Sequence, residues 1–265
     1  FECTDHFYEG LDELMDYVQH PYFTEQNVEK EKGIIGQEIM MYDDDPGWQS
    51  YINAMDCLYK ENPVKIDIAG SIESISKINP DVLNKCYNTF YNPSNMVFVA
   101  CGDFEPEELL KEIKKRIVEK QKQGEIKRIY PPEEKTINKK EKETKMPISM
   151  PIFAIGFKDR IIKNQEENVK RHIAIEIILN MLMGESSALY AKLYDRGTLL
   201  ATPDFDYEFS SEYAHVLISG VSERPKEVQR ELIKTIENVK KEGINKEDLE
   251  RIKRKIYGDY VSEYN

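Results

Sequence analysis

Two glutamates, Glu31 and Glu38, are the residues whose type and spacing best suit chemistry. They lie seven positions apart in a stretch of helical periodicity, so both carboxylates project from one face, two turns apart. Ile34, Ile35 and Ile39 share or adjoin that face, which predicts that Glu38 lies at or near a buried surface. A buried carboxylate needs a cation, hydrogen-bond donors or a metal ion. A glutamate pair on a helix is otherwise solvated surface, and the spacing leaves both interpretations open.

Two glycines, Gly33 and Gly36, interrupt the same predicted helix. A glycine inside a helix costs about 1 kcal/mol relative to alanine. We therefore expect close packing against a neighbouring segment at these positions, which weakens the interpretation as plain solvated surface.

No complete metal or nucleophile motif accompanies the glutamates. The histidines His6, His20, His172 and His215 are scattered, and neither HExxH nor its inverse HxxEH occurs. His172 lies one helical turn before Glu176, a pair that could hold a proton or half a metal site. On an apolar helix such a histidine is more typical of a core or boundary position. GxSxG, GxGxxG and phosphate-loop motifs are also absent.

Composition narrows the class of protein. The 265 residues carry 37 Lys and Arg against 49 Asp and Glu, a formal net charge of −12, which argues against a general nucleic-acid binder. Four cysteines without CxxC spacing indicate neither a disulfide framework nor a thiolate zinc site, and favour a reducing, cytoplasmic setting. The longest apolar run, near Ile173 to Met183, is interrupted by Glu176 and Asn180, so no membrane span is predicted.

The chain divides by composition into two domains and a linker. We predict a first domain over residues 1–118, a charged linker over 119–146 and a second domain over 147–265. Apolar residues nearly vanish in the linker, Lys and Glu alternate, and Pro131-Pro132 stiffens its middle, so we interpret it as solvated.

The second domain has the pattern of a two-layer α+β fold. Its elements follow the order β-α-α-β-β-α-α, which predicts helices packed on a mainly antiparallel sheet. The expected strands are Pro151–Phe157, Phe205–Phe209 and Ala214–Val221, and the expected helices are Glu167–Met183, Ser186–Tyr194, Pro225–Glu242 and one capped by Asn245.

The first domain is unbalanced by comparison. It has at least five predicted helices but one convincing strand, the apolar run Met96 to Cys101. Five amphipathic helices with one strand have no sheet against which to bury their apolar faces. We therefore expect a truncated first domain.

Several blocks, in order, resemble the pitrilysin-type zinc peptidases of family M16. They are residues 27–46 around Glu38, the stretch Asn62–Ser71, the stretch Phe90–Phe104, which is similar to the family's FYxPxNM…xGD segment, and Ser187–Gly197. The resemblance covers essentially the whole chain and is closest to the bacterial, predicted-protease branch. It implies repeated α+β domains that pair into a clamshell around a peptide-holding chamber.

The resemblance also implies a zinc site. In the family, HxxEH supplies two zinc ligands and the general base, and a downstream glutamate completes the site. That glutamate matches Glu38 here, and Glu31 matches the family's supporting acid.

This chain departs from the family because it lacks HxxEH. The missing HxxEH zinc ligands and the missing strands of the first domain both indicate an incomplete protein. We therefore expect a fragment of a zinc metalloendopeptidase acting on short or unfolded peptides. The fragment alone is expected to be inactive, to bind no zinc tightly, and to form homodimers through exposed helix faces. The alternatives are a non-catalytic M16-like subunit that binds peptide or serves as a scaffold, and a purely structural α+β protein. In either M16-like case the expected partners are peptides and paired M16-like domains or subunits, with no nucleic acid or membrane.

Overall fold

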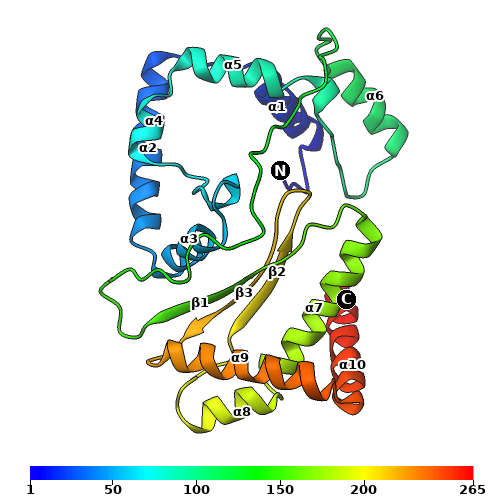
Figure 1. The fold of residues 1–265 in the computed structure, drawn as a ribbon. Helices are drawn as coiled ribbons and strands as arrows, with labels where there is room; N and C mark the ends of the chain where they lie inside the picture. Colours follow the sequence, from blue (N-terminus) through cyan, green and yellow to red (C-terminus); the bar gives the residue numbers. More distant parts are fainter. Residues whose placement is uncertain (265) are drawn as a thin grey trace. The chain divides into compact units, whose positions relative to one another are not determined.

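A computed structural model describes residues 1–264, and the chain divides into two compact units (Figure 1). The first unit consists of residues 1–39 and 69–129, and the second contains residues 40–68 and the described chain from Tyr130 onward.

The first unit is helical. Its elements are α1 (Phe7–Gln19), α2 (Glu25–Asp43, whose last residues belong to the second unit), α4 (Ile72–Ser76), α5 (Pro80–Phe90), the 3-10 helix η2 (Pro93–Asn95) and α6 (Pro106–Arg116). Side-chain caps start the helices: Thr24 Oγ1 accepts the backbone N–H of Asn27 at 3.2 Å before α2, and Asn79 caps α5. A small core of Leu11, Met15 and Leu109 joins α1 to α6.

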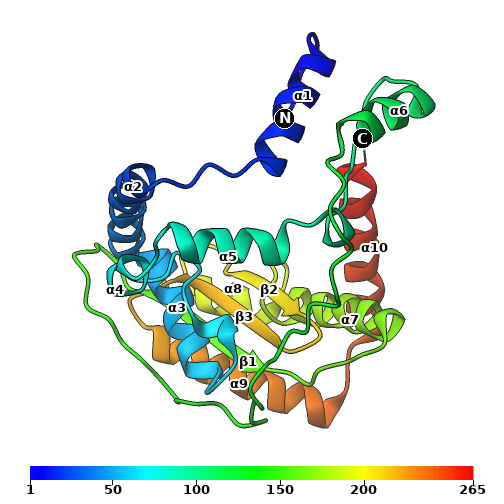
Figure 2. The same cartoon turned by 90° about the horizontal axis from the view of Figure 1, so that it is seen from above.

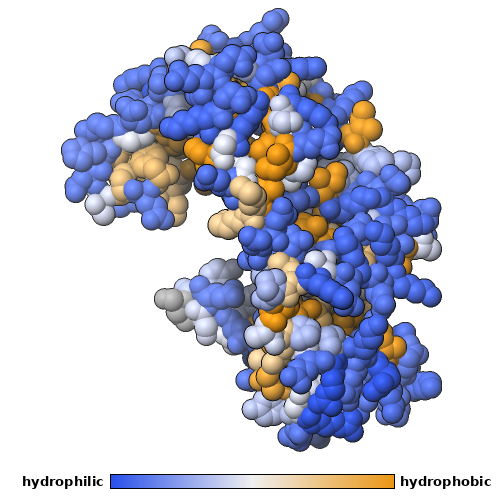
Figure 3. Space-filling model, turned by 90° about the vertical axis from the view of Figure 1, so that its left-hand side faces the viewer, coloured by the Kyte–Doolittle hydropathy of each residue, from blue (hydrophilic) through white to orange (hydrophobic). Residues whose placement is uncertain are grey.

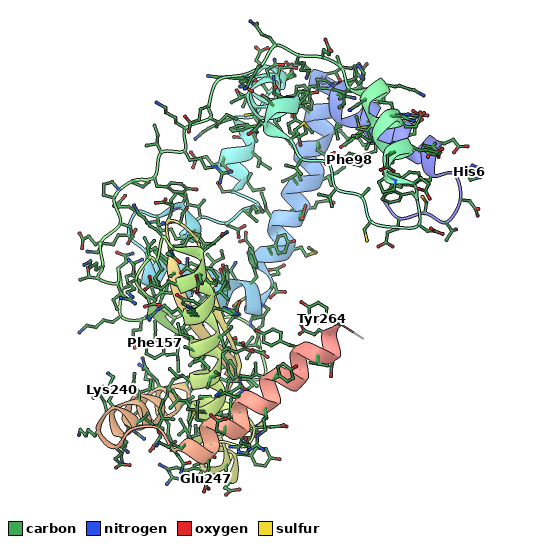
Figure 4. All side chains as sticks on the ribbon, turned by 90° about the vertical axis from the view of Figure 1, so that its right-hand side faces the viewer. His6, Phe98, Phe157, Lys240, Glu247 and Tyr264 are labelled. Atoms are coloured by element: carbon green, nitrogen blue, oxygen red, sulfur yellow. The ribbon has the colours of Figure 1, made fainter. Side chains whose placement is uncertain are left out.

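The predicted strand Met96–Cys101 is wrong. The segment is extended but unpaired, and no strand lies within the first unit's described residues. Val97 is 87% exposed and Val99 is 83% exposed, while Figure 4 shows Phe98 on a stretch drawn as coil. A β-branched apolar run favours extended backbone, but a strand also needs a neighbour for its hydrogen bonds. The expected lack of a sheet is therefore observed here.

The second unit contains a three-stranded antiparallel sheet of strand order β1-β3-β2. The predicted α+β architecture is confirmed. The strands are β1 (Ile152–Lys158), β2 (Asp204–Phe209) and β3 (Ala214–Val221), and the helices are α3 (Pro46–Leu58), the 3-10 helix η1 (Pro63–Lys65), α7 (Gln165–Met183), α8 (Ala188–Asp195), α9 (Pro225–Glu242) and α10 (Lys246–Glu263).

Both faces of this sheet are covered, which follows from the alternation of side chains along a strand. Phe153 and Ile155 of β1 enter the main core, which is built with α7, α8 and α9. Ala154 and Gly156 face the opposite way, toward α3. A Cβ atom at Gly156 would lie 2.9 Å from a methyl carbon of Leu58, so glycine permits the close approach of α3 to β1.

Helix α3 therefore packs with the second unit, whereas the sequence places it in a first domain ending at residue 118. The apolar side of α3 is visible in the sequence, but the segment that covers it lies about a hundred residues later in β1. The domain boundaries at 118 and 147 remain predictions.

The predicted linker, residues 119–146, contains no helix or strand and is exposed over most of its length, as expected. It is nevertheless anchored. The backbone N–H groups of Asn138 and Lys139 donate to the Cys57 carbonyl at 2.8 and 2.9 Å. The Glu133 side chain is 8% exposed. The second half of the linker is thus attached to the second unit.

One stretch, Gln165–Asp195, is long and apolar enough by length and composition to cross a membrane. Leu179, Leu182 and Met183 of α7 lie in the core of the second unit, and α10 packs against α7 (Figure 2). Core helices meet the same compositional test, so we interpret this stretch as a core helix.

Candidate functional site

Glu31 and Glu38 both lie on the exposed side of α2. The buried residues of this helix are Val28, Gly36 and Ile39, so the prediction that Glu38 lies at or near a buried face is wrong. Successive helical residues point about 100° apart, and Ile39 faces inward while Glu38 faces outward. Neither glutamate has a hydrogen bond or ion pair with another described residue.

The two glycines of α2 differ. Gly36 is buried beside α4, and a Cβ atom there would make an ordinary van der Waals contact at 3.4 Å with Cδ1 of Ile72, so the expected neighbouring segment is present although glycine is not required for it. Gly33 is exposed, and a Cβ atom there would meet nothing within 4 Å, so the same expectation is wrong for Gly33. Of the two glycines, Gly36 therefore lies against a neighbouring helix and Gly33 does not.

The exposed stripe of α2 combines acidic and apolar side chains. Glu31, Ile34 and Glu38 follow at intervals of three and four, and Ile34 is 48% exposed. Such apolar groups stand out on a mostly hydrophilic surface (Figure 3). A carboxylate beside exposed apolar groups is an arrangement suited to contact with another segment or ligand.

The described residues include no group of three or more His, Cys, Asp or Glu side chains that could hold a metal ion. His6 pairs with Glu9 at 3.2 Å and His20 with Asp16 at 2.8 Å, all exposed. A protein zinc site needs at least three protein ligands. Glu38 can supply one oxygen ligand, and a zinc site that includes it needs further ligands beside it.

His172 and Glu176 do not form the pair that their spacing allows. Glu176 Oε2 accepts a hydrogen bond from the Tyr260 hydroxyl at 2.9 Å. His172 is half-buried beside the rings of Tyr207 and Phe209, with centroid distances of 6.0 and 5.8 Å. Its boundary position is confirmed, and its Nδ1 atom is buried without a hydrogen-bond partner among the described residues.

Sequence reasoning missed a polar cluster around His215, between α3 and the sheet. His215 is fully buried. The Tyr59 hydroxyl lies 3.0 Å from Nδ1 of His215 and 3.2 Å from the Ala214 carbonyl. Nε2 has no hydrogen-bond partner in the described chain and lies 3.8 Å from Oε2 of Glu208. The single hydroxyl proton of Tyr59 is donated to the Ala214 carbonyl, so the contact with His215 is a hydrogen bond when Nδ1 carries the imidazole proton and donates it to the Tyr59 oxygen.

Burial sets the protonation states of this cluster. It lowers the pKa of His215 to about 4, so the imidazole is neutral at pH 7. Burial, followed by the charge of Glu208 and a hydrogen bond to it, raises the pKa of Tyr51 to about 12. Burial and the neighbouring Asp206 also raise the pKa of Glu208. Tyr59 and His215 are both fully buried, and their contacts hold the end of α3 to the sheet.

The sequence contains a weak signal for this cluster. Tyr213 and His215 are two apart, so they face the same side at the start of β3. Their partners could not be read from spacing, because Glu208 becomes the cross-strand neighbour of His215 only through the β2–β3 register.

Comparison with known proteins places these features in a family. Residues 77–256, more than half of the chain, match the family described as the Peptidase M16 inactive domain. An uncharacterised zinc protease of Bacillus subtilis, YmfH, is 38% identical over 268 aligned residues, which cover 100% of this chain and 62% of that protein. The chain therefore spans about three fifths of this relative's length.

Solved structures agree with this assignment. The crystal structure of a protein from Alicyclobacillus acidocaldarius, described as an M16-like peptidase, matches with a TM-score of 0.88 and 33% identity, over 97% of this chain and 61% of that chain. A protease from Helicobacter pylori shares the fold, with a TM-score of 0.76 and 18% identity, over 96% of this chain and 63% of that chain. The chain belongs to the M16 peptidase family.

Proposed function

We propose that the whole protein is a zinc-dependent metalloendopeptidase that hydrolyses short or unfolded peptides, and that Glu38 is one of its zinc ligands. The observation that carries the proposal is the 38% identity, across all of this chain, to a relative named a zinc protease. The exposed position of Glu38 on α2 supports the proposal, because a carboxylate that binds zinc together with ligands from other segments must be accessible to those segments.

This chain contributes only part of such a site. Zinc, when bound, polarises a carbonyl and lowers the pKa of a bound water. The residues assigned here are Glu38 as an oxygen ligand and Glu31, two turns earlier on α2, as a supporting acid. The other donors must come from elsewhere in the whole protein, since the described residues hold no group of three. Alone, this chain is expected to be inactive and to bind no zinc tightly.

We also propose a cytoplasmic protein in which paired M16-like domains or subunits enclose the peptide. The cysteines Cys3, Cys57, Cys86 and Cys101 are all free thiols, which fits a reducing compartment. The exposed apolar side chains of the first unit provide surface for a partner domain.

The test uses the full-length parent protein and its Glu38→Gln variant. Zinc content and hydrolysis of an unfolded peptide are measured together. Glu38→Gln should abolish stoichiometric zinc and peptide hydrolysis, whereas Glu31→Gln should lower activity by about 10- to 100-fold, the usual effect of losing a supporting partner of a metal ligand. Glu25→Gln, at the exposed start of α2, is the matched control and should match the wild type. Full zinc occupancy in Glu38→Gln would contradict the assignment.

A second candidate is a non-catalytic M16-like subunit that binds peptides or serves as a scaffold. The match of residues 77–256 to the family's inactive domain favours it. The same experiment separates the two functions. If the wild-type parent lacks an HxxEH segment and zinc but still binds the unfolded peptide, the peptidase proposal fails and the subunit proposal stands.

A further inference from the structure

Three successive backbone amides converge on one carboxylate in the second unit. The N–H of Lys60 donates to Oε1 of Glu133 at 3.0 Å, and those of Glu61 and Asn62 donate to Oε2 at 2.8 and 2.7 Å. These amides directly follow α3, where Tyr59 turns the chain into an extended conformation. Consecutive N–H groups pointing at one site form an anion-binding concavity.

Lys158, at the end of β1, completes this cradle. Its ammonium group donates to Oε1 of Glu133 at 2.5 Å and to the carbonyls of Glu134 and Thr136 at 2.6 and 3.2 Å. The side chains of Lys158 and Glu133 are each 8% exposed. The ammonium also lies 4.8 Å from the centroid of the Tyr59 ring. All three ammonium donors are therefore used on residues 133–136.

The cradle is matched to a negative charge. Burial by itself would raise the pKa of Glu133, but the Lys158 hydrogen bond and the three backbone N–H bonds outweigh it and lower that pKa to about 2. Hydrogen bonds to an ionised acceptor are about twice as strong as neutral ones. The geometry thus selects a carboxylate over a neutral amide of the same shape.

Residues following Glu133 continue this attachment along the end of α3. The Asn138 side chain donates to the Asp56 carbonyl at 2.9 Å, in addition to the backbone bonds from Asn138 and Lys139 to Cys57. Lys139 and Lys142 pair with the Asp56 carboxylate at 2.8 and 3.0 Å. Donors and positive charge at a helix C-terminus satisfy its last carbonyls and its dipole.

We propose that the amides of residues 60–62 and Lys158 form a carboxylate-binding latch, occupied in cis by Glu133. The latch fixes residues 133–142 to the C-terminal end of α3, so the free length of the connection after α6 ends at residue 132. All its contacts lie inside the second unit, and the inference does not depend on the proposed peptidase function.

Amide hydrogen exchange of the full 265-residue chain tests the latch. In the wild type, the amides of residues 60–62 and 138–139 should be as protected as those of β3. Glu133→Gln keeps the shape but removes the charge, and should speed their exchange by about tenfold or more. Glu134→Gln is the matched control. Among the described residues, the Glu134 carboxylate accepts hydrogen bonds from the Lys60 ammonium and the Thr136 hydroxyl and from no backbone amide of residues 60–62, so losing its charge should leave these amides unchanged.

The chemical class of the occupant is tested with Glu133→Ala and acetate. Acetate should restore protection to the amides of residues 60–62, whereas chloride at equal ionic strength should not. Equal effects of the two salts would overturn the carboxylate assignment. Unprotected amides at residues 60–62 in the wild type would overturn the latch itself, whether or not the variants fold. Exchange in Glu133→Gln equal to that of Glu134→Gln would also overturn it.

Discussion

The two units differ in how their apolar segments are covered. In the second unit, β3 lies between β1 and β2 and has side chains packed on both faces, and Ile218 is 1% exposed. In the first unit, the comparable apolar run Met96–Cys101 has no strand beside it among the described residues, and Val97 is 87% exposed. Similar composition therefore produced a core strand in one place and an exposed coil in the other.

This contrast shows that β-branched composition encodes extended backbone but not a sheet. A strand becomes part of a core when other segments satisfy its hydrogen bonds and cover its faces. The core of the first unit is accordingly small, with Leu11, Met15 and Leu109 as its fully packed cluster. Stability is expected to be concentrated in the second unit, and the following predictions test that expectation.

The largest expected effect is the loss of a core side chain from the second unit. Leu193 of α8 is 0% exposed, so Leu193→Ala should lower the free energy of unfolding by about 2–5 kcal/mol. The matched change in the first unit is Leu110→Ala on α6, where the side chain is 51% exposed and the loss should stay below about 1 kcal/mol. Urea unfolding of both variants measures this difference, and equal losses would contradict the contrast.

The second effect is a loss of stability on acidification, carried by His215. The folded-state pKa of His215 is lowered to about 4 from 6.5. Between these values the unfolded chain binds a proton that the folded unit excludes, so the free energy of unfolding falls as pH decreases. The loss should be about 2 kcal/mol between about pH 7 and pH 5. The pKa of Glu208 is raised in the folded state, so protonation of Glu208 favours the folded unit as pH decreases and partly offsets this loss of stability.

Trp48 is the single tryptophan of the chain and lies in α3, so its fluorescence follows the second unit during urea unfolding. His215→Asn removes the titrating group and should flatten the pH dependence, although the variant is less stable at neutral pH. An unchanged pH slope in this variant would show that another group is responsible.

The third prediction is that loss of a helix cap lowers helix stability equally in the two units. Asn79 and Asn164 are exposed N-caps of α5 and α7, and each side chain accepts the backbone N–H three residues later at 2.9 Å. Replacing either asparagine by alanine should cost its helix about 1 kcal/mol. Amide exchange in the first turn of each helix measures the local loss. A much larger loss at one of them would mean that capping here depends on tertiary context.

The smallest expected effect on folding is at Val97 and Val99. The double change Val97→Lys and Val99→Lys should alter the free energy of unfolding by less than about 0.5 kcal/mol, because both side chains are more than four fifths exposed. The same change should weaken self-association of this chain, since an unpaired apolar edge invites pairing with another copy. Sedimentation over a range of concentrations tests this. A wild type that stays monomeric at every concentration would contradict it.

Much of the local structure was predictable from the sequence. The bounds of β3 and α9 were predicted to the residue, and those of β1, β2 and α7 to within two residues. Side-chain caps such as Thr24, Asn79 and Asn245 act within three residues of their own position. The candidate ligand Glu38 was found through its spacing and the family resemblance, and its ligand role remains a prediction.

The sequence by itself determined where helices and extended segments form, because periodicity and capping depend on residues a few positions apart. Tertiary structure decided which segments became covered. It placed α3 on β1, left residues 96–101 unpaired and turned Glu38 outward. It also joined Tyr59 to His215 and Lys60 to Glu133, pairs separated by 156 and 73 residues. Such contacts depend on how distant segments meet in the folded chain, which no local pattern records.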